Sequence, residues 1–226
     1  MQNRYDNILR KNNQLIIDLA PANHILRLIT ALELKKIAGA KAKVLEIGIG
    51  EGDLTKYLIE NNPDISLDAL DVSAEMINEA KKRLSGNKIN FICADAFEYL
   101  QNYESKYEVI VSAWTLHNFR WEDKQKIFEA IFQKLNSGGH LILMDKVYPD
   151  DEKLGKELLE VQQNRYRQYL EKDVAREIIE HEEKDFTSEY RMQEKRLVDC
   201  LTTIGYSSIA IADRVERDVV LIAKKK

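Results

Sequence analysis

From Lys43 onward the chain alternates short apolar runs with amphipathic segments, and this alternation limits the available folds more than any other feature. Apolar runs that are continuous are typical of strands buried on both faces, as in a parallel sheet covered by helices. Right-handed crossovers between such strands leave few topologies. The runs predict five strands, at 43–48, 66–71, 89–94, 107–112 and 140–147.

The segments between these strands have helical spacing of apolar residues. They predict helices at 53–60, 74–84, 97–100 and 122–135, with a turn at SGG (137–139). Near the end of the chain, a helix at 190–204 precedes two strands at 206–212 and 217–223, whose short link predicts an antiparallel hairpin at one edge. We therefore expect an α/β fold with a seven-stranded, mostly parallel sheet, helices on both faces and an antiparallel last strand.

Two segments lie outside this rhythm. Residues 1–40 have helical spacing, with Pro21 suited to a helix start and Gly39 to a helix end. Residues 150–187 are rich in charge and helical in pattern. The sequence therefore predicts one domain, 1–226, with four parts: an N-terminal helical cap (1–40), a core (41–147), a helical lid inserted after strand five (148–190), and a C-terminal helix with a hairpin (191–226).

Composition narrows the classes of protein. The net charge of −4 disfavours non-specific binding to nucleic acid, which needs a broad basic surface. No apolar run is long enough to cross a bilayer, and the first residues lack the apolar core of a secretory signal. Cys93 and Cys200 offer neither a disulfide framework nor metal-ligand spacing. We expect a cytoplasmic protein without a membrane partner, either a monomer or a homodimer.

A glycine-rich turn follows the first strand of the core, in VLEIGIGEGDLT (44–55). Glycines at a strand-to-helix turn let the backbone approach a ligand closely, because a side chain would block it. Asp71 ends the next strand, where a carboxylate can accept hydrogen bonds from a ribose diol. The alternative is that Asp71 only caps the helix that starts near Ser73. The turn and the carboxylate together indicate a nucleoside site.

This segment resembles motif I of the class I methyltransferases that depend on S-adenosylmethionine (SAM), in which an acidic residue precedes GxGxG. The third glycine comes one residue earlier than in the dehydrogenase GxGxxG pattern. The family's other landmarks follow in order: LDALDVSAEMI (67–77), CADAFEY (93–99), YEVIVSAW (107–114) and LNSGGHLIL (135–143). The resemblance implies a Rossmann-like fold, SAM as the cofactor and S-adenosylhomocysteine (SAH) as its product.

The resemblance also implies roles for individual residues. The expected cofactor contacts are Glu46 with the methionine ammonium group, Gly48, Gly50 and Gly52 along the methionine and sugar, Asp71 with the ribose, Asp95 with the adenine amino group, Val72 and Met76 beside the adenine, Ala96 through its backbone, and Ser112. For Asp95 the alternative is a cap of the short helix at 97–100.

Methyl transfer asks little of the protein, because the sulfonium already activates the methyl group. In-line placement of a nucleophile and exclusion of water are the main needs. His117, just past the fourth strand in SAWTLHNF, is the candidate general base. The alternative is that His117 and Asn118 only hydrogen-bond their own loop. No metal set is predicted, because the residues after strand four are not carboxylates and Asp145 alone is insufficient.

The two irregular segments are expected to build the acceptor pocket. Its candidate residues are Tyr5, His24, Trp114, Arg165, Tyr166, Tyr169 and Arg191. Each of these could instead be an exposed or half-buried residue on a charged helix. The leading hypothesis is a methyltransferase acting on an oxygen, nitrogen or carbon atom of a small molecule.

Two alternative functions stay open, and a third is disfavoured. The helical insertion is distantly similar to that of carboxy-SAM synthases, which act upstream of tRNA wobble-uridine modification, so a carboxy-SAM synthase-like or tRNA-modification-related enzyme is one alternative. A non-catalytic SAM-binding protein is another. A nicotinamide-dependent oxidoreductase is disfavoured by the glycine spacing and by the lack of a Tyr-x-x-x-Lys pair.

Overall fold

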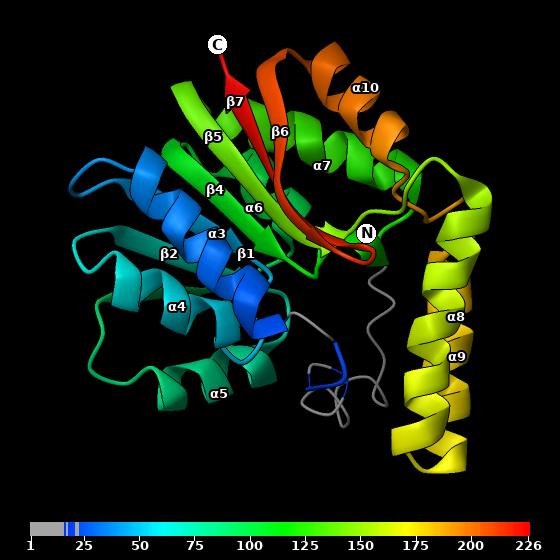
Figure 1. The fold of residues 1–226 in the computed structure, drawn as a ribbon. Helices are drawn as coiled ribbons and strands as arrows, with labels where there is room; N and C mark the ends of the chain where they lie inside the picture. The colour runs from blue at the N-terminus through cyan, green and yellow to red at the C-terminus, as the bar shows by residue number, and fades with distance from the viewer. Residues whose placement is uncertain (1–15, 17, 21–22) are drawn as a thin grey trace.

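The computed structural model describes residues 16, 18–20 and 23–226, so Tyr5 and Pro21 lie outside the described residues. Its centre is a seven-stranded sheet in the order β3-β2-β1-β4-β5-β7-β6 (Figure 1). The strands are β1 (Lys43–Ile47), β2 (Ser66–Asp71), β3 (Ile89–Cys93), β4 (Tyr107–Ala113), β5 (Leu135–Lys146), β6 (Tyr206–Val215) and β7 (Asp218–Lys225). The first five are parallel, and β7 runs antiparallel to both β5 and β6. The predicted fold class and the antiparallel hairpin are confirmed.

Helices cover both faces of the sheet because successive strand residues point to opposite sides. Val44 of β1 packs with apolar residues of α3 (Asn23–Ile37) and α4 (Asp53–Asn61), and α5 (Ala74–Arg83) packs on β2 at the same face. Leu45, the next residue, packs on the other face with α6 (Ala96–Asn102), α7 (Trp121–Lys134) and α10 (Glu194–Ile204). Two apolar cores therefore enclose the sheet.

The predicted turn at 137–139 is replaced by an irregularity inside a longer strand. β5 begins at Leu135, and its pairing with β4 jumps from Tyr107–Leu135 to Val109–His140. Gly138 takes up the extra residues with a φ of 75°. A β-carbon on Gly139 would come within 2.9 Å of the Glu108 carbonyl oxygen, so the bulge needs a glycine there.

The helical insertion after strand five is confirmed as an antiparallel pair, α8 (Glu152–Tyr169) and α9 (Lys172–Asp185), drawn in yellow beside the sheet (Figure 1). Asp151 caps α8 by accepting bonds from the Lys153 and Leu154 amides at 2.9 and 3.1 Å. Tyr166 of α8 packs against Ile178 of α9. A lid function for the pair stays a prediction.

Among the described residues, no helix combines the length and apolar character that a bilayer crossing requires. The predicted helical pattern before residue 40 is described only in part. There α3 ends at Ile37, shortly before Gly39, as the glycine indicated.

Candidate active site

A cavity of about 170 Å³ opens at the carboxyl ends of β1, β2 and β4. Ligand sites in open α/β sheets lie at these strand ends. Most of the predicted cofactor residues line it, namely Glu46, Gly48, Gly50, Asp71, Val72, Met76, Asp95 and Ala96. The structure thus brings together side chains from three successive strand–helix turns.

The three glycines of the turn differ in the space that a side chain would have. Gly48, Gly50 and Gly52 all have φ between 55° and 85°, a region that favours glycine. A β-carbon on Gly48 would come within 2.0 Å of the Thr115 hydroxyl oxygen, and one on Gly52 within 2.6 Å of Leu84. A β-carbon on Gly50 would meet no protein atom within 4 Å. Gly50 therefore keeps cavity space open, whereas Gly52 serves helix packing and is not among the described lining residues.

Asp71 organises the turn from the neighbouring strand. Its carboxylate accepts the Gly50 amide at 2.9 Å and the Ser73 amide at 2.8 Å. The cap of α5 is Ser73, whose hydroxyl accepts the Met76 amide at 3.3 Å, so the alternative of Asp71 as that cap is wrong. Asp71 lines the cavity and holds the glycine turn in shape.

Asp95 caps a helix and also lines the cavity, while its contact with the adenine stays a prediction. It caps α6, because one carboxylate oxygen accepts the Phe97 and Glu98 amides at 2.9 and 3.1 Å. It also lines the cavity next to Ala96. The two hydrogen bonds of the cap fix the orientation of the Asp95 carboxylate at the edge of the cavity.

Glu46 ends up buried below the glycine turn, with 1% of its surface exposed. It accepts the Thr55 hydroxyl at 2.8 Å. Burial raises the pKa of Glu46 to about 8, although the Thr55 hydrogen bond and Arg27 act against the shift. Ser112 does not reach the cavity: it is fully buried, and its hydroxyl donates to the Ile47 carbonyl at 3.2 Å. Ser112 therefore ties β4 to β1, unlike its predicted place in the cofactor site.

Arg27 is a lining residue that the sequence did not single out. It comes from α3, with its side chain 6% exposed, and one guanidinium nitrogen lies 3.5 Å from an Asp53 carboxylate oxygen. The guanidinium carbon lies 5.5 Å from the centroid of a Trp114 ring, and Nε has no hydrogen-bond partner among the described residues. The sequence signal for Arg27 was a single cation within the otherwise apolar residues 25–29.

A second cavity, of about 90 Å³, adjoins the first. The two share Trp114 and Asn118 as lining residues. Residues of α8, α9 and the β6–β7 turn close the far side, among them Tyr166, His181 and Arg217. Trp114 has a φ of 42°, an uncommon conformation for a bulky residue that points to a constrained position between the cavities.

Two of the predicted acceptor residues, Trp114 and Tyr166, line this second cavity. The others within the described part of the chain are absent from its lining. His24 is exposed and contacts the Tyr57 hydroxyl, and Tyr169 is 64% exposed. Arg165 pairs with Glu216, and Arg191 lies over the Phe186 ring.

His117 lines the second cavity and is oriented by a buried carboxylate. Its Nδ1 lies 2.6 Å from an Asp145 oxygen, and Asp145 also accepts the Leu116 and His117 amides at 2.9 and 3.2 Å. Asp145 is fully buried at the end of β5, beside the loop that follows β4. The Asp145–His117 pair leaves Nε2 on the side of Asp185, 4.0 Å from its oxygen.

Buried ion pairs form the rest of this wall. Lys146 lies 3.0 Å from a Glu182 oxygen and 2.9 Å from an Asp185 oxygen, and Arg217 pairs with Glu182. Burial alone would raise the pKa of Glu182, but Arg217 and Lys146 lower it to about 2. Lys146 and Arg217 are therefore held by carboxylates of the insertion.

A family model described as "Methyltransferase domain" matches residues 44–139, the segment that builds the first cavity. The sheet order and the cavity at its switch point define a Rossmann-like methyltransferase architecture. The chain belongs to the class I SAM-dependent methyltransferases, the family whose cofactor is SAM.

The chain is similar to three known proteins, two by sequence and one by fold. It is 30% identical to a carboxy-S-adenosyl-L-methionine synthase from Campylobacter lari, over 69% of this chain and 68% of that protein. It is 33% identical to malonyl-[acyl-carrier protein] O-methyltransferase 1 from Ilyobacter polytropus, over 43% of this chain and 35% of that protein. The fold matches human N-acetylserotonin methyltransferase in complex with SAM, with a TM-score of 0.67, 16% identity and coverage of 96% of this chain and 55% of the human chain.

Proposed function

We propose that the chain transfers the methyl group of SAM to a small-molecule acceptor in the second cavity. The observation that carries the proposal is the junction of the two cavities at Trp114 and Asn118. A donor in the first cavity and an acceptor in the second would meet there, as in-line displacement requires. The small size of the second cavity and its closure by α8 and α9 support a small acceptor.

The first cavity fits SAM by the chemistry of its donors and acceptors. Asp71 would accept the ribose hydroxyls, Asp95 the adenine amino group, and Val72 with Met76 would flank the adenine. Gly50 leaves room for the cofactor next to the backbone. Arg27, a buried cation at the same cavity, is the residue we assign to the methionine carboxylate.

The bound sulfonium supplies an activated methyl group, and its carbon–sulfur bond breaks as the acceptor's bond to the methyl carbon forms, leaving SAH. The chain's own contribution is to position the acceptor and to exclude water. His117 contributes a ring nitrogen toward the acceptor, and Asp145 holds that ring in place. His117 is therefore the residue we propose to orient the acceptor or take its proton.

The relative from Campylobacter lari supports a second candidate function. Its name denotes synthesis of a carboxylated SAM, and the alignment covers about two thirds of both chains. Mass spectrometry of the nucleoside recovered after incubation with SAM, with small acceptors in one set of samples and with carboxylic acids as carboxyl donors in another, separates the candidates. SAH together with a methylated acceptor supports methyl transfer, whereas a carboxylated SAM supports the synthase activity.

The proposed function is tested with methyl-labelled SAM and a panel of small oxygen, nitrogen and carbon acceptors. We expect acceptor-dependent formation of SAH, and a loss of about 100-fold or more in kcat for His117→Gln with little change in SAM affinity. His140→Gln is the matched control, because His140 lies far from the cavity, near the other end of β5, where it is opposite Lys224 of β7 in the sheet. Binding of SAM without turnover on any acceptor would favour the non-catalytic alternative.

The raised pKa of Glu46 predicts that SAM binding releases a proton near neutral pH. The free protein holds Glu46 protonated below about pH 8, and the cationic sulfonium and ammonium groups favour the ionised carboxylate. Affinity should therefore increase as the pH rises from about 6 toward 8, by up to about tenfold per unit. Calorimetry in buffers of different ionisation enthalpy measures the proton. Glu46→Gln should abolish the release, and release that persists in this variant would contradict the assignment.

A further inference from the structure

We propose that His117, His181 and Asp185 bind a divalent transition-metal cation at the wall of the second cavity. Their candidate ligand atoms all lie within 4.8 Å of one another, and all three residues are buried. Nε2 of His117 lies 4.0 Å from an Asp185 oxygen, and Nε2 of His181 lies 3.8 Å from the same oxygen. This convergence of two imidazoles and one carboxylate is the observation behind the proposal.

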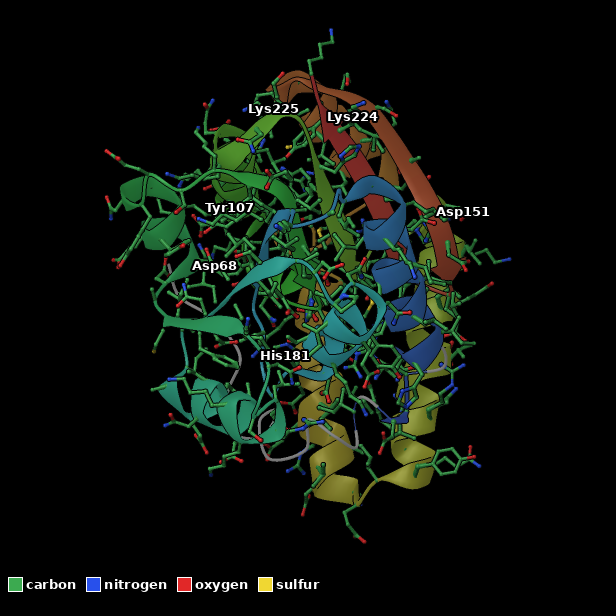
Figure 2. All side chains as sticks on the ribbon, turned by 90° about the vertical axis from the view of Figure 1, so that its left-hand side faces the viewer. Asp68, Tyr107, Asp151, His181, Lys224 and Lys225 are labelled. Atoms are coloured by element: carbon green, nitrogen blue, oxygen red, sulfur yellow. The ribbon has the colours of Figure 1, made fainter. Side chains whose placement is uncertain are left out.

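The three ligands come from segments far apart in the sequence. His117 belongs to the short helix η1 (Leu116–Asn118) after β4, whereas His181 and Asp185 are four residues apart on α9 and so share one face of that helix. Packing of α9 against the end of the sheet brings the two segments together, through the bonds from Lys146. Figure 2 shows His181 well away from Lys224 and Lys225, which mark the other end of the sheet.

The surroundings orient these ligands as an outer shell does in metal sites. The other ring nitrogen of His117 contacts Asp145 at 2.6 Å, which fixes the direction of Nε2. Lys146 donates at 2.9 Å to the same Asp185 oxygen that both imidazoles approach. An ionised carboxylate oxygen has more than one lone pair, so this oxygen can accept Lys146 and still ligate a metal. Asp145 thus holds His117 in place, and Lys146 holds Asp185.

The ligand types select the class of metal. Two imidazole nitrogens and one carboxylate oxygen suit Zn²⁺ and neighbouring transition metals rather than Mg²⁺ or Ca²⁺. Bonds of about 2.0–2.2 Å would require the ligand atoms to close in by roughly an ångström, which side-chain rotation allows. Three protein ligands leave a position open, and His117 and His181 both line the cavity.

This inference rests on the proposed function and deepens it. A metal at this wall would bind the acceptor's oxygen or nitrogen and lower its proton affinity, so that the proton leaves to solvent before the atom attacks the methyl carbon. In that arrangement His117 orients the acceptor through the metal, which is the first of the two roles proposed for it, and its Nε2 takes no proton.

The test is stoichiometric binding of Zn²⁺ to the full chain, after chelator treatment and dialysis, with Co²⁺ as a spectroscopic substitute. We expect one ion per chain and visible Co²⁺ bands of a low-coordinate nitrogen–oxygen site. His181→Ala and Asp185→Asn should each weaken Zn²⁺ binding by about 100-fold or more, and Asp145→Asn by about 10–100-fold. His140→Ala is the matched control and should bind as wild type.

Binding of SAM, measured on the same samples, separates this inference from the proposed function. His181 and Asp185 are not among the described residues lining the first cavity, so their variants should still bind SAM if folded. Wild-type protein that binds SAM but retains no stoichiometric Zn²⁺ would overturn the metal site alone. Equal Zn²⁺ affinity in wild type and folded His181→Ala would overturn it as well.

Discussion

Replacing Asp71 by alanine is expected to weaken SAM binding by about 100-fold or more. The substitution removes the proposed acceptor of the ribose hydroxyls, and hydrogen bonds to a charged group contribute about 1.5–3 kcal/mol each. It also removes the acceptor of the Gly50 amide at 2.9 Å and the Ser73 amide at 2.8 Å. The glycine turn would therefore lose the contact that holds it beside the cofactor. Equilibrium dialysis with labelled SAM measures the effect.

Two further variants make this result specific. Asp71→Asn keeps the shape and one acceptor oxygen, so its loss should be smaller than that of alanine. Asp173→Ala is the matched control, because the Asp173 side chain is 80% exposed on α9 and pairs only with a neighbour on its own helix among the contacts described. An Asp71→Ala protein that folds and binds SAM within a few-fold of wild type would remove Asp71 from the site.

Replacing Arg217 by methionine is expected to destabilise the protein by about 3–5 kcal/mol. Arg217 is 5% exposed, pairs with buried Glu182 and donates to the Tyr148 hydroxyl at 3.0 Å. Removing one partner of a buried ion pair leaves the other charge uncompensated, which costs more than the pair itself contributes. Urea unfolding of the free protein, followed by circular dichroism, gives the free energy of unfolding.

The control for Arg217 is Arg176→Met, because Arg176 forms an exposed pair with Asp173 and should change stability by less than about 1 kcal/mol. A second change, Glu182→Gln in the Arg217→Met background, should restore part of the lost stability by removing the uncompensated carboxylate. A loss below about 1 kcal/mol for Arg217→Met would show that this ion pair does not hold α9 to the sheet.

The sheet could be predicted from local patterns because each strand is a short apolar run with turn residues at its ends. The prediction was least accurate at β5, where the SGG sequence resembles a turn between separate elements. The pairing of Tyr107 with Leu135, and the space beneath Gly139, place these residues inside the strand instead. Such a bulge depends on the neighbouring strand, which local sequence does not contain.

The cofactor cavity was also largely predictable, since its residues cluster in three strand–helix turns. Gly52 and Ser112 differ from their predicted roles because a motif position does not say which direction a group faces: Gly52 faces Leu84, and Ser112 faces β1. Arg27 was missed because it reaches the cavity from α3, outside every motif.

The acceptor cavity could not be built from the sequence. It joins η1, the insertion and the β6–β7 turn, so that His117, His181 and Arg217 meet only after the chain has folded. Tyr169 and His24 illustrate the limit, because a candidate aromatic on a charged helix can face solvent as readily as a pocket. The partner of His117 could not be predicted either, although Asp145 lies one residue before the end of β5, the strand next to β4.

The central claim is that the cavity beneath the glycine turn is a SAM site, and calorimetric titration of the purified chain tests it most directly. The titrants are SAM, SAH and NADH, each added to wild type and to Asp71→Ala. We predict one SAM or SAH per wild-type chain, much weaker binding to the variant, and no binding of NADH. Saturable binding of NADH together with no binding of SAM would contradict the account.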